Sequence, residues 1–460
     1  MRRFHVLALI GIAAAAACTS SSDPGADPAA TLAGAPGTRT AHGDMPGTCN
    51  PDHYVCPRAA RGFEISPVPI DTHGKSNDEI VQIGYGSYLV NASSACGGCH
   101  SGPAGFLAGG SPFAIDHDGH FVFGRNLTPD PTTGMKLTED QFVETLRTGR
   151  DFNPGSAGML VVMPWLFFRW ASDGDLRAIY AYLRAIPPAS NAVPPDHKLG
   201  LGLPPAISFS GTYDEGDVAR VLPPDDGSLG PNLERGRAIQ PLAEPCGVGN
   251  RARFERGSYL ANSLGTCAEC HTQGLPGAPL GRDHALRLVT AHYLTGGTVF
   301  VVPPPLQPVI HQNRTMAANL RGAEHGFFHE PGVNYHLFAQ IIDTQSHVDE
   351  DPPRPLGFPM PASSFRNLVD EDLRAIFSYM TYLTPALVSD VPRQDYARWC
   401  GGDADCEAGE TCHVAADPTI GNECVGRACE IDADCDTCQT CSARSCAAPA
   451  PDSACVLSGA

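Results

Sequence analysis

The sequence predicts a mainly α-helical protein with two tandem helical domains and a small disulfide-rich module at its C-terminal end. A Cys-x-x-Cys-His motif occurs twice, at 96–100 and 267–271, and Gly-Ser-Tyr-Leu precedes each copy at the same distance. The string Asp-Leu-Arg-Ala-Ile also occurs twice, at 175–179 and 372–376. Repetition of separate strings in the same order indicates duplication of one helical unit. The ten cysteines crowded into the last 61 residues indicate a structure of another kind.

The first helical domain is expected over residues 76–190. Thr138 begins a segment with the pattern of a capping box and Gly149 ends it, so a short helix is predicted between them. Ser172 is expected to cap a further helix, because apolar residues recur after it at helical spacing and Pro187 stops it. The helices predicted in this domain cover residues 77–91, 138–147 and 176–186.

The second helical domain is expected over residues 251–388 and repeats this order. Residues 191–250, which connect the two domains, are rich in Pro and Gly, and this composition is typical of an interdomain linker. The helices predicted in the second domain cover residues 254–262, 335–343 and the segment from Asp370 onward.

The N-terminal end has the layout of an export signal. Two arginines are followed by an apolar run that ends in alanines and is too short to span a bilayer. Cys18 follows directly, so residues 1–18 are predicted to be a lipoprotein-type signal peptide, with Cys18 receiving the lipid. The alternative is an ordinary signal peptide that is cut near Ala17. Residues 19–75 are rich in Pro, Gly, Ala and Ser, and we interpret them as a flexible tether.

Export implies an oxidising compartment, in which cysteines without another role form disulfides. The module over 395–460 is therefore expected to contain five disulfides. Cys49 and Cys56 are close enough in sequence to pair, and the sequence offers no partner for Cys246. The whole chain has a net charge of −19, which argues against a nucleic-acid or anionic-lipid partner. From Cys400 onward the module has 11 acidic and 2 basic residues, which suggests a basic partner for it.

The two Cys-x-x-Cys-His motifs have the spacing that attaches haem covalently. Two thiols add to the vinyl groups of one haem, and the following histidine becomes the proximal ligand of the iron. A zinc knuckle would need two further ligands in short reach, and a redox disulfide would need no histidine after each pair. We therefore predict two covalently bound haem c groups. The attachment residues are Cys96, Cys99, Cys267 and Cys270, and the proximal ligands are His100 and His271.

A methionine lies ten residues before Asp173 in the first domain and ten residues before Asp370 in the second, near the start of the last predicted helix, and is the candidate sixth ligand. Met163 precedes a proline and so does Met360, so each would lie in a stiffened loop. Met159 is the alternative in the first domain. In the second domain bis-histidine ligation is the alternative, with His336 as its foremost candidate because it lies in a helical stretch. The histidines of that domain are His311, His325, His329, His336 and His347.

These segments resemble a known family, the exported diheme c-type cytochromes, which are related to the cytochrome c subunits of bacterial membrane dehydrogenases. The resemblance covers roughly residues 76–388 and implies a cytochrome c fold for each domain, with His100 and Met163 at one haem and His271 and Met360 at the other. In the second copy Asn319-Leu320 is not followed by Thr-Pro-Asp, so its haem-edge loop departs from the pattern. The segments that carry the resemblance are Gly-x-Tyr-Leu before each motif, Asn126-Leu127-Thr128-Pro129-Asp130, Met163-Pro164-Trp165 and residues 175–180.

The function that this resemblance implies is electron transfer from a donor, such as a dehydrogenase or respiratory complex, to a terminal acceptor. Redox proteins would be its partners, and the periplasm or cell surface its location, with the lipid on Cys18 as the membrane anchor. One alternative is a peroxidase-like diheme enzyme with one open haem, although no motif for a distal acid or base is evident. Another is a surface binding module to which cytochrome domains are attached.

We predict that Cys18→Ser releases soluble, haem-loaded protein from the membrane fraction, because the substitution removes the lipidated thiol. Fractionation of the exporting host, with a haem stain of each fraction, measures this. Cys246→Ser is the control and should leave the distribution unchanged. Wild-type protein that is already soluble after export would show that the leader is an ordinary signal peptide.

Overall fold

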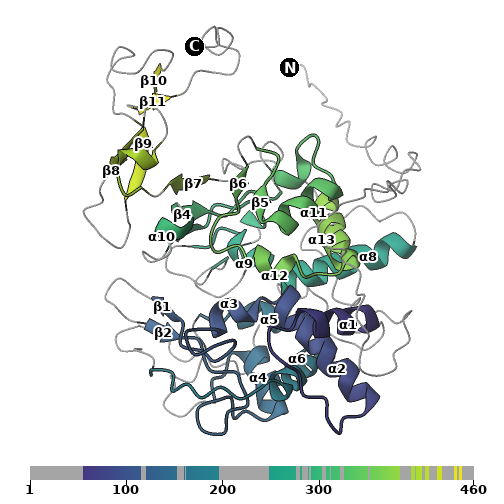
Figure 1. The fold of residues 1–460 in the computed structure, drawn as a ribbon. Helices are drawn as coiled ribbons and strands as arrows, with labels where there is room; N and C mark the ends of the chain where they lie inside the picture. Colours follow the sequence, from purple (N-terminus) through teal and green to yellow (C-terminus); the bar gives the residue numbers. More distant parts are fainter. Residues whose placement is uncertain are drawn as a thin grey trace, which may run out of the picture.

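The computed structural model shows two helical halves that lie against each other, followed by short strands of the C-terminal module (Figure 1). The first half is the lower, purple-to-blue part of the figure, and the second half is the teal-to-green part above it. The residues that the structure describes are 55–114, 121–152, 160, 162–195, 248–275, 280–281, 288–289, 292–302, 307–310, 312–321, 326–350, 353–383, 395–398, 400–406, 410–413, 422–426, 440–442 and 445–447.

The elements of the first half are α1 (Val55–Ile65), α2 (Asn77–Tyr88), the π-helix η1 (Leu89–Ser93), α3 (Cys96–His100), β1 (Pro112–Ala114), β2 (Phe121–Phe123), α4 (Glu139–Thr148), α5 (Trp165–Phe168) and α6 (Asp173–Ala185). Capping boxes begin α2 at Ser76 with Glu79 and α4 at Thr138 with Gln141. Gly149 ends α4 in the left-handed conformation, with φ 74°. The helix predicted from Thr138 is therefore confirmed.

Helix α1 lies inside the segment that the sequence analysis interprets as a tether over 19–75, and that interpretation is wrong for residues 55–65. The helix is packed tightly on α2, since a Cβ on Gly62 would lie 1.8 Å from the carbonyl oxygen of Gly84. Its Arg58 is only 3% exposed. Such a short helix owes most of its stability to tertiary contacts, and the local amino-acid composition gives no information about these contacts.

The second half repeats this order with additional short strands. Its elements are α8 (Val248–Tyr259), the π-helix η2 (Leu260–Leu264), α9 (Cys267–Cys270), β3 (Val299–Val301), α10 (Gln307–Ile310), β4 (Gln312–Met316), the 3₁₀-helix η4 (Phe327–His329), α11 (Tyr335–Thr344), β5 (Ser346–His347), β6 (Arg354–Pro355), α12 (Ala362–Phe365) and α13 (Asp370–Tyr382). Buried side chains from both halves form one continuous hydrophobic cluster.

The two repeated strings of the sequence meet at a helix crossing in each half. α2 packs against α6, and α8 packs against α13. A Cβ on Gly86 would lie 1.8 Å from the carbonyl oxygen of Ala178, and a Cβ on Gly257 would lie 1.9 Å from that of Ala375. Only glycine allows the backbones to approach so closely. In each half, the Gly-Ser-Tyr-Leu string therefore supplies the glycine of the crossing, and the Asp-Leu-Arg-Ala-Ile string supplies the backbone carbonyl that this glycine contacts.

The strands form small antiparallel sheets, and one of them joins the C-terminal module to the second half. β1 pairs with β2, β5 pairs with β6, and β3, β4 and β7 (Asp395–Arg398) form a three-stranded sheet. The side-chain amide of Asn313 also donates to the backbone oxygen of Asn422, at 3.3 Å. The further elements of the module are η5 (Asp403–Asp405), β8 (Glu410–His413), β9 (Glu423–Gly426), β10 (Thr440–Ser442) and β11 (Ser445–Ala447).

The C-terminal module contains disulfides, as the sequence predicts. Two of them are described, Cys400–Cys412 and Cys406–Cys424. The side chains of the other six cysteines of the module lie outside the described part, so the number of five bridges stays a prediction. Cys56 is disulfide-bonded. Both Cys49 and Cys246 lie outside the described residues, so the pairing of Cys56 with Cys49 also stays a prediction.

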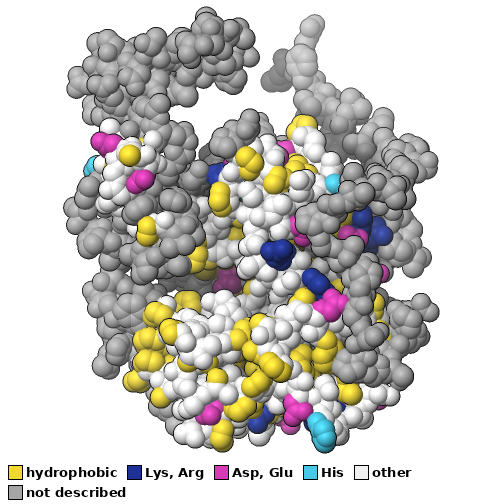
Figure 2. Space-filling view, viewed as in Figure 1, with side chains coloured by type: hydrophobic (Ala, Val, Ile, Leu, Met, Phe, Trp, Pro, Cys, Tyr) yellow, Lys and Arg dark blue, Asp and Glu magenta, His cyan; other side chains and the backbone are white. Residues whose placement is uncertain are grey.

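The surface of the two halves is mixed in character on the face drawn in Figure 2. Apolar side chains are numerous there over the first half, and charged side chains are scattered among them. Among the helices that the structure describes, none combines the length and the apolarity that crossing a bilayer requires.

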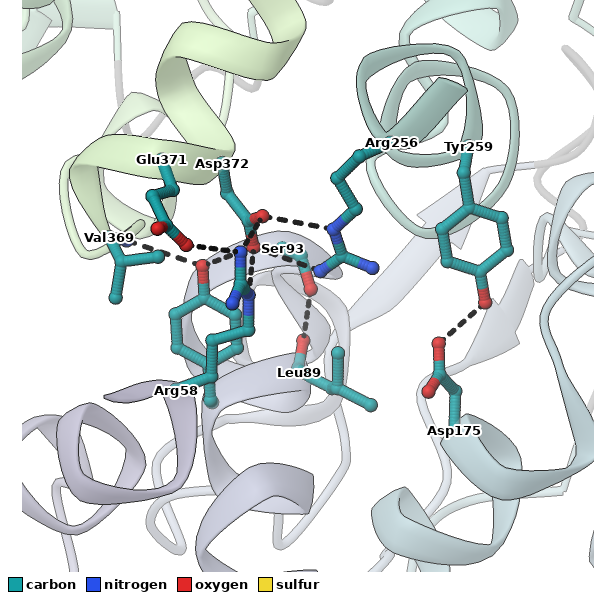
Figure 3. Close-up of polar contacts among 10 residues, drawn as sticks. Arg58, Leu89, Ser93, Asp175, Arg256, Tyr259, Val369, Glu371 and Asp372 are labelled. Atoms are coloured by element: carbon teal, nitrogen blue, oxygen red, sulfur yellow. Dashed lines mark hydrogen bonds and ion pairs between the residues drawn. The ribbon is translucent and has the colours of Figure 1, made fainter. Parts of the chain in front are cut away.

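A pair of equivalent hydrogen bonds joins the two halves. Tyr88 of α2 donates to Asp372 of α13 at 2.7 Å, and Tyr259 of α8 donates to Asp175 of α6 at 2.5 Å (Figure 3). Both tyrosines belong to the Gly-Ser-Tyr-Leu repeats, and both aspartates begin the Asp-Leu-Arg-Ala-Ile repeats. The hydroxyl oxygen of Tyr88 also accepts a hydrogen bond from the backbone N–H of Val369, just before α13, at 3.2 Å. That of Tyr259 accepts one from the N–H of Ser172, just before α6, at 3.0 Å. The halves thus contact each other with near twofold symmetry.

Asp372 differs from its counterpart because two arginines bind it. Arg58 of α1 donates to its two carboxylate oxygens at 3.0 and 2.6 Å, and Arg256 of α8 donates to both at 2.9 Å. Although burial by itself favours the neutral acid, the two guanidinium groups hold the pKa of Asp372 well below its usual range. Burial instead raises the pKa of Asp175. Arg58 therefore ties α1 to the second half through a fully buried carboxylate.

We predict that Asp372→Asn lowers the free energy of unfolding by about 3–5 kcal/mol, because it leaves two buried guanidinium groups without their carboxylate. The low pKa of Asp372 stabilises the fold at every pH above the ordinary value of about 3.9, and this contribution is lost as the pH falls below that value. Urea unfolding from pH 7 to pH 3 measures both effects, and the pH dependence below pH 4 should be shallower in the variant.

Glu371→Gln is the matched control, since Glu371 contacts Arg58 at 3.3 Å but its side chain is 75% exposed. A surface ion pair of this kind contributes at most about 1 kcal/mol. Equal losses of unfolding free energy in Asp372→Asn and Glu371→Gln would contradict the prediction that the buried carboxylate contributes more than the exposed one.

Candidate functional site

Each Cys-x-x-Cys-His motif begins two residues after the end of a π-helix, and the second of these residues has the left-handed conformation. Ala95 has φ 50° before α3, and Thr266 has φ 47° before α9. Such a residue ends the preceding helix and redirects the chain. The motif then forms a single helical turn, so its two cysteines and its histidine are held on a short rigid segment in both halves.

The four cysteines of the motifs are free thiols, whereas disulfides form elsewhere in the chain. Burial raises the pKa of Cys96 and of Cys267 to about 12, so neither is a thiolate at neutral pH. Reactive redox pairs depend on thiolates. Within the described residues, the one group of three potential metal ligands is Cys400, Cys406 and Cys424, and disulfides bind all three.

The histidines of the two motifs are oriented by equivalent backbone carbonyls. Nδ1 of His100 lies 2.9 Å from the oxygen of Arg125, and Nδ1 of His271 lies 2.8 Å from that of Ala318. Burial lowers the pKa of both imidazoles, which favours the neutral form that binds iron. With Nδ1–H donating to the carbonyl, Nε2 remains available as a ligand. The free thiols and the oriented histidine together fit covalent haem in both halves.

The residues that follow Met163 and Met360 have the same conformation. The prolines that follow them cap α5 and α12 with φ/ψ of −76°/48° and −83°/45°. The backbone oxygen of each methionine accepts from the N–H two residues later, at 2.7 and 2.9 Å. Both side chains are half-buried against the hydrophobic cluster. This correspondence supports the assignment of both as sixth ligands, which stays a prediction, and Met159 lies outside the described residues.

The histidines proposed as alternatives in the second half have different surroundings. His336 is exposed on α11, with its ring against that of Tyr335. His347 is buried near the carboxylates of Asp349 and Glu350, at 3.8 and 3.9 Å. His329 is half-buried in η4. An exposed helical side chain is poorly placed for a buried iron, so His336 is a weaker candidate than its position in a predicted helix implied. His311 and His325 lie outside the described residues.

The symmetric packing of the halves also brings the two motifs near each other. α5, which follows Met163, packs against η2, and α12, which follows Met360, packs against η1. Cys99 is near enough to Cys270 to contribute to the rise in the pKa of Cys270 that burial chiefly causes. Glu269 acts on the pKa of both thiols. No sequence pattern gave this proximity, because it follows from how the two halves pack.

A difference between the halves lies beside the carbonyls that orient the histidines. The side-chain oxygen of Asn126 accepts from the backbone N–H of Thr128, and that of Asn319 accepts from the N–H of Arg321, at 3.0 and 3.1 Å. These bonds identify Arg321 as the counterpart of Thr128. The two residues are 6% and 1% exposed, so a charged group is buried in one half where the other has a hydroxyl. The sequence signal for it was the missing Thr-Pro-Asp after Asn319-Leu320.

Comparison with known proteins agrees with these features. Over 315 residues, 67% of this chain and 60% of the relative, the chain is 27% identical to the gluconate 2-dehydrogenase cytochrome c subunit of Pantoea cypripedii. It is 29% identical over 216 residues to the fructose dehydrogenase cytochrome subunit of Gluconobacter japonicus, with 46% of this chain and 38% of the relative aligned. Seven curated proteins match in total. This chain is a relative of the cytochrome c subunits of dehydrogenases.

A further relative of this chain is the diheme cytochrome c-type protein of Cereibacter sphaeroides, 27% identical over 188 residues, or 39% of this chain and 54% of the relative. No family model matches the chain. The chain spans at most 60% of the length of these three relatives. Its kinship with cytochromes c supports covalently bound haem c as its cofactor.

We predict that Met163→Ala lowers the reduction potential of one haem and removes about half of the sulfur-to-iron absorption band, because a thioether sulfur raises the potential of the iron that it binds. Met360→Ala should do the same at the other haem. Met135→Leu is the control, since Met135 is a buried methionine of the hydrophobic cluster. An unchanged band in Met163→Ala would transfer the assignment to Met159, and an unchanged band in Met360→Ala would favour a histidine.

Proposed function

We propose that this chain is an exported cytochrome c that transfers electrons through two haems, from a dehydrogenase or respiratory donor to a terminal acceptor. The observation that supports it most is the duplication of one complete site. Each half has two free thiols, a histidine oriented through Nδ1, and a methionine in a proline-capped loop. Dehydrogenase cytochrome subunits among the relatives support a redox protein as the donor.

The proposed roles of the residues are the same in both halves. Cys96 and Cys99, and likewise Cys267 and Cys270, would hold haem c through thioether bonds, and haem supplies one-electron chemistry when bound. The oriented histidine and the methionine sulfur would be the protein ligands of the iron. Because both ligands come from packed segments, the coordination would change little between oxidation states, which suits electron transfer.

Proximity of the two motifs supports transfer between the halves. The thiols of Cys99 and Cys270 interact electrostatically across the interface. The π-helices that precede the two motifs also contact each other. A single chain would then accept an electron at one half and deliver it from the other. A peroxidase-like enzyme would instead require one iron without a second protein ligand, and the matching methionine loops favour the carrier.

The remaining parts of the proposal concern location. The N-terminal leader supports export, and a lipid on Cys18 would hold the protein at a membrane that faces the periplasm or the exterior. The C-terminal module would then project an acidic surface, for which a basic protein is the proposed partner. Its attachment through β7 to β4 places this module on the second half.

We predict two haem additions in the intact mass of the exported protein, because each motif provides two thiols for one haem. The double variant Cys96→Ser/Cys99→Ser should lose one addition, and Cys267→Ser/Cys270→Ser should lose the other. Cys56→Ser is the control for loss of a structural cysteine and should retain both. Wild-type protein with one haem or none would contradict the proposal, and a haem that binds an added ligand in the wild type would favour the enzyme.

A further inference from the structure

The second half has a buried cation, Arg321, at the position where the first half has Thr128. Arg321 is 6% exposed, and its Nη1 donates to the backbone oxygen of Tyr293 at 3.3 Å. The hydroxyl of Tyr293 in turn donates to Asn262 at 2.6 Å and lies 2.7 Å from that of Tyr379. Arg321 is thus held among buried polar groups of the second half, on the chain segment that orients His271.

This arginine is located beside the predicted haem site. The backbone oxygen of Ala318, three residues earlier, lies 2.8 Å from Nδ1 of His271. Tyr293, which Arg321 contacts, is close enough to Cys267 for the thiol to influence the pKa of the tyrosine, which burial chiefly raises. Arg321 is therefore close to His271 along its own chain segment, and close to Cys267 through its contact with Tyr293.

The groups around Arg321 offset only part of the free-energy cost of burying its charge. Burial lowers its pKa, and the hydroxyls of Tyr293 and Tyr379 offset this only in part. Arg58, by contrast, has a raised pKa, since the carboxylate of Asp372 more than compensates its burial. Even when lowered, the pKa of an arginine lies far above neutrality, so Arg321 keeps its charge.

The counterpart of Arg321 is neutral, and the cation nearest to the first site is less buried. Thr128 donates through its hydroxyl to Asn126 at 2.7 Å. Arg125 is near enough to His100 to contribute to the lowering of its pKa, which burial chiefly causes, but Arg125 is only half-buried. Water screens a half-buried charge far more strongly than a buried one. The electrostatic effect of a cation should therefore be larger at the second haem.

We propose that Arg321 raises the reduction potential of the second-half haem above that of the first, so that an electron entering through the first half comes to reside on the second. This inference rests on the proposed function. Ferric haem has one more positive charge than ferrous haem, so a buried cation nearby destabilises the ferric form and favours reduction. The first half is then the side of the donor, and the second half, which adjoins the C-terminal module, is the side of the acceptor.

Spectroelectrochemical titration of the two-haem protein and of Arg321→Thr tests this. Threonine is chosen because it occupies the equivalent position of the first half. We expect two one-electron transitions in the wild type, of which only the one at higher potential moves to lower potential in the variant. Loss of one buried charge near the haem should lower the ferrous-to-ferric ratio of that haem at a fixed potential on the order of tenfold.

Two further variants keep the test decisive. Arg321→Lys retains the charge and should leave both potentials near their wild-type values. Arg125→Ala removes the half-buried cation of the first half and should shift the lower transition much less than Arg321→Thr shifts the higher one. If Arg321→Thr loads haem poorly, Arg321→Gln, which is closer in size, takes its place with the same expectation.

The possible failures are distinguishable. Fewer than two haems in the intact mass would contradict the proposed function itself. Two haems with unchanged potentials in Arg321→Thr, or a shift confined to the lower transition, would overturn the role of Arg321 while leaving electron transfer in place. A shift of equal size in Arg321→Lys would show that the side chain acts through packing and not through its charge.

Discussion

The buried carboxylate of Asp372 in α13 is the point at which side chains from α1, α2 and α8 meet. α1 reaches it through Arg58, α8 through Arg256 and α2 through Tyr88, while Asp372 itself belongs to α13. Because the carboxylate is fully buried, its charge is favourable only while both guanidinium groups are in place. This arrangement makes the relative position of the two halves specific, since a shift of either half would leave buried charges unpaired.

That fixed position determines the geometry of the candidate site. Each motif follows a π-helix, and each π-helix contacts the short helix that begins beyond the methionine of the other half. The interface therefore joins the segments before the cysteines to those after the methionines. In the two-haem carrier that we propose, the two motifs would hold their cofactors near each other because of the same packing that buries Asp372.

Duplication provided the symmetry, and divergence has changed its chemistry at defined positions. Arg256 stands where the first half has Tyr85, so the second aspartate is held charged while burial raises the pKa of Asp175. Arg321 stands where the first half has Thr128. Both changes add a buried cation to the second half. Two copies with one fold can thus provide different electrostatic surroundings for the same cofactor, which a two-site carrier needs if electrons are to move in one direction.

The sequence by itself determined the features that depend on neighbours along the chain. The spacing of the Cys-x-x-Cys-His motifs, the capping box at Thr138 and the stop at Gly149 are local chemistry, and the helices there formed as predicted. The repeated strings revealed the duplication for the same reason. The correspondence of Met163 with Met360 was also visible in the sequence, because each lies ten residues before the aspartate at the start of the following helix, and duplication preserves such a spacing.

Only the tertiary structure decided which of these local units touch. It showed that Gly86 and Gly257 are required by helix crossings, and that residues 55–65 form a helix where composition indicated a tether. It also showed that Tyr88 pairs with an aspartate 284 residues away. The burial that gives Arg321 its electrostatic effect is equally invisible along the chain. Contacts between distant segments arise from packing of whole faces, and neither hydrophobic period nor motif spacing specifies which faces meet.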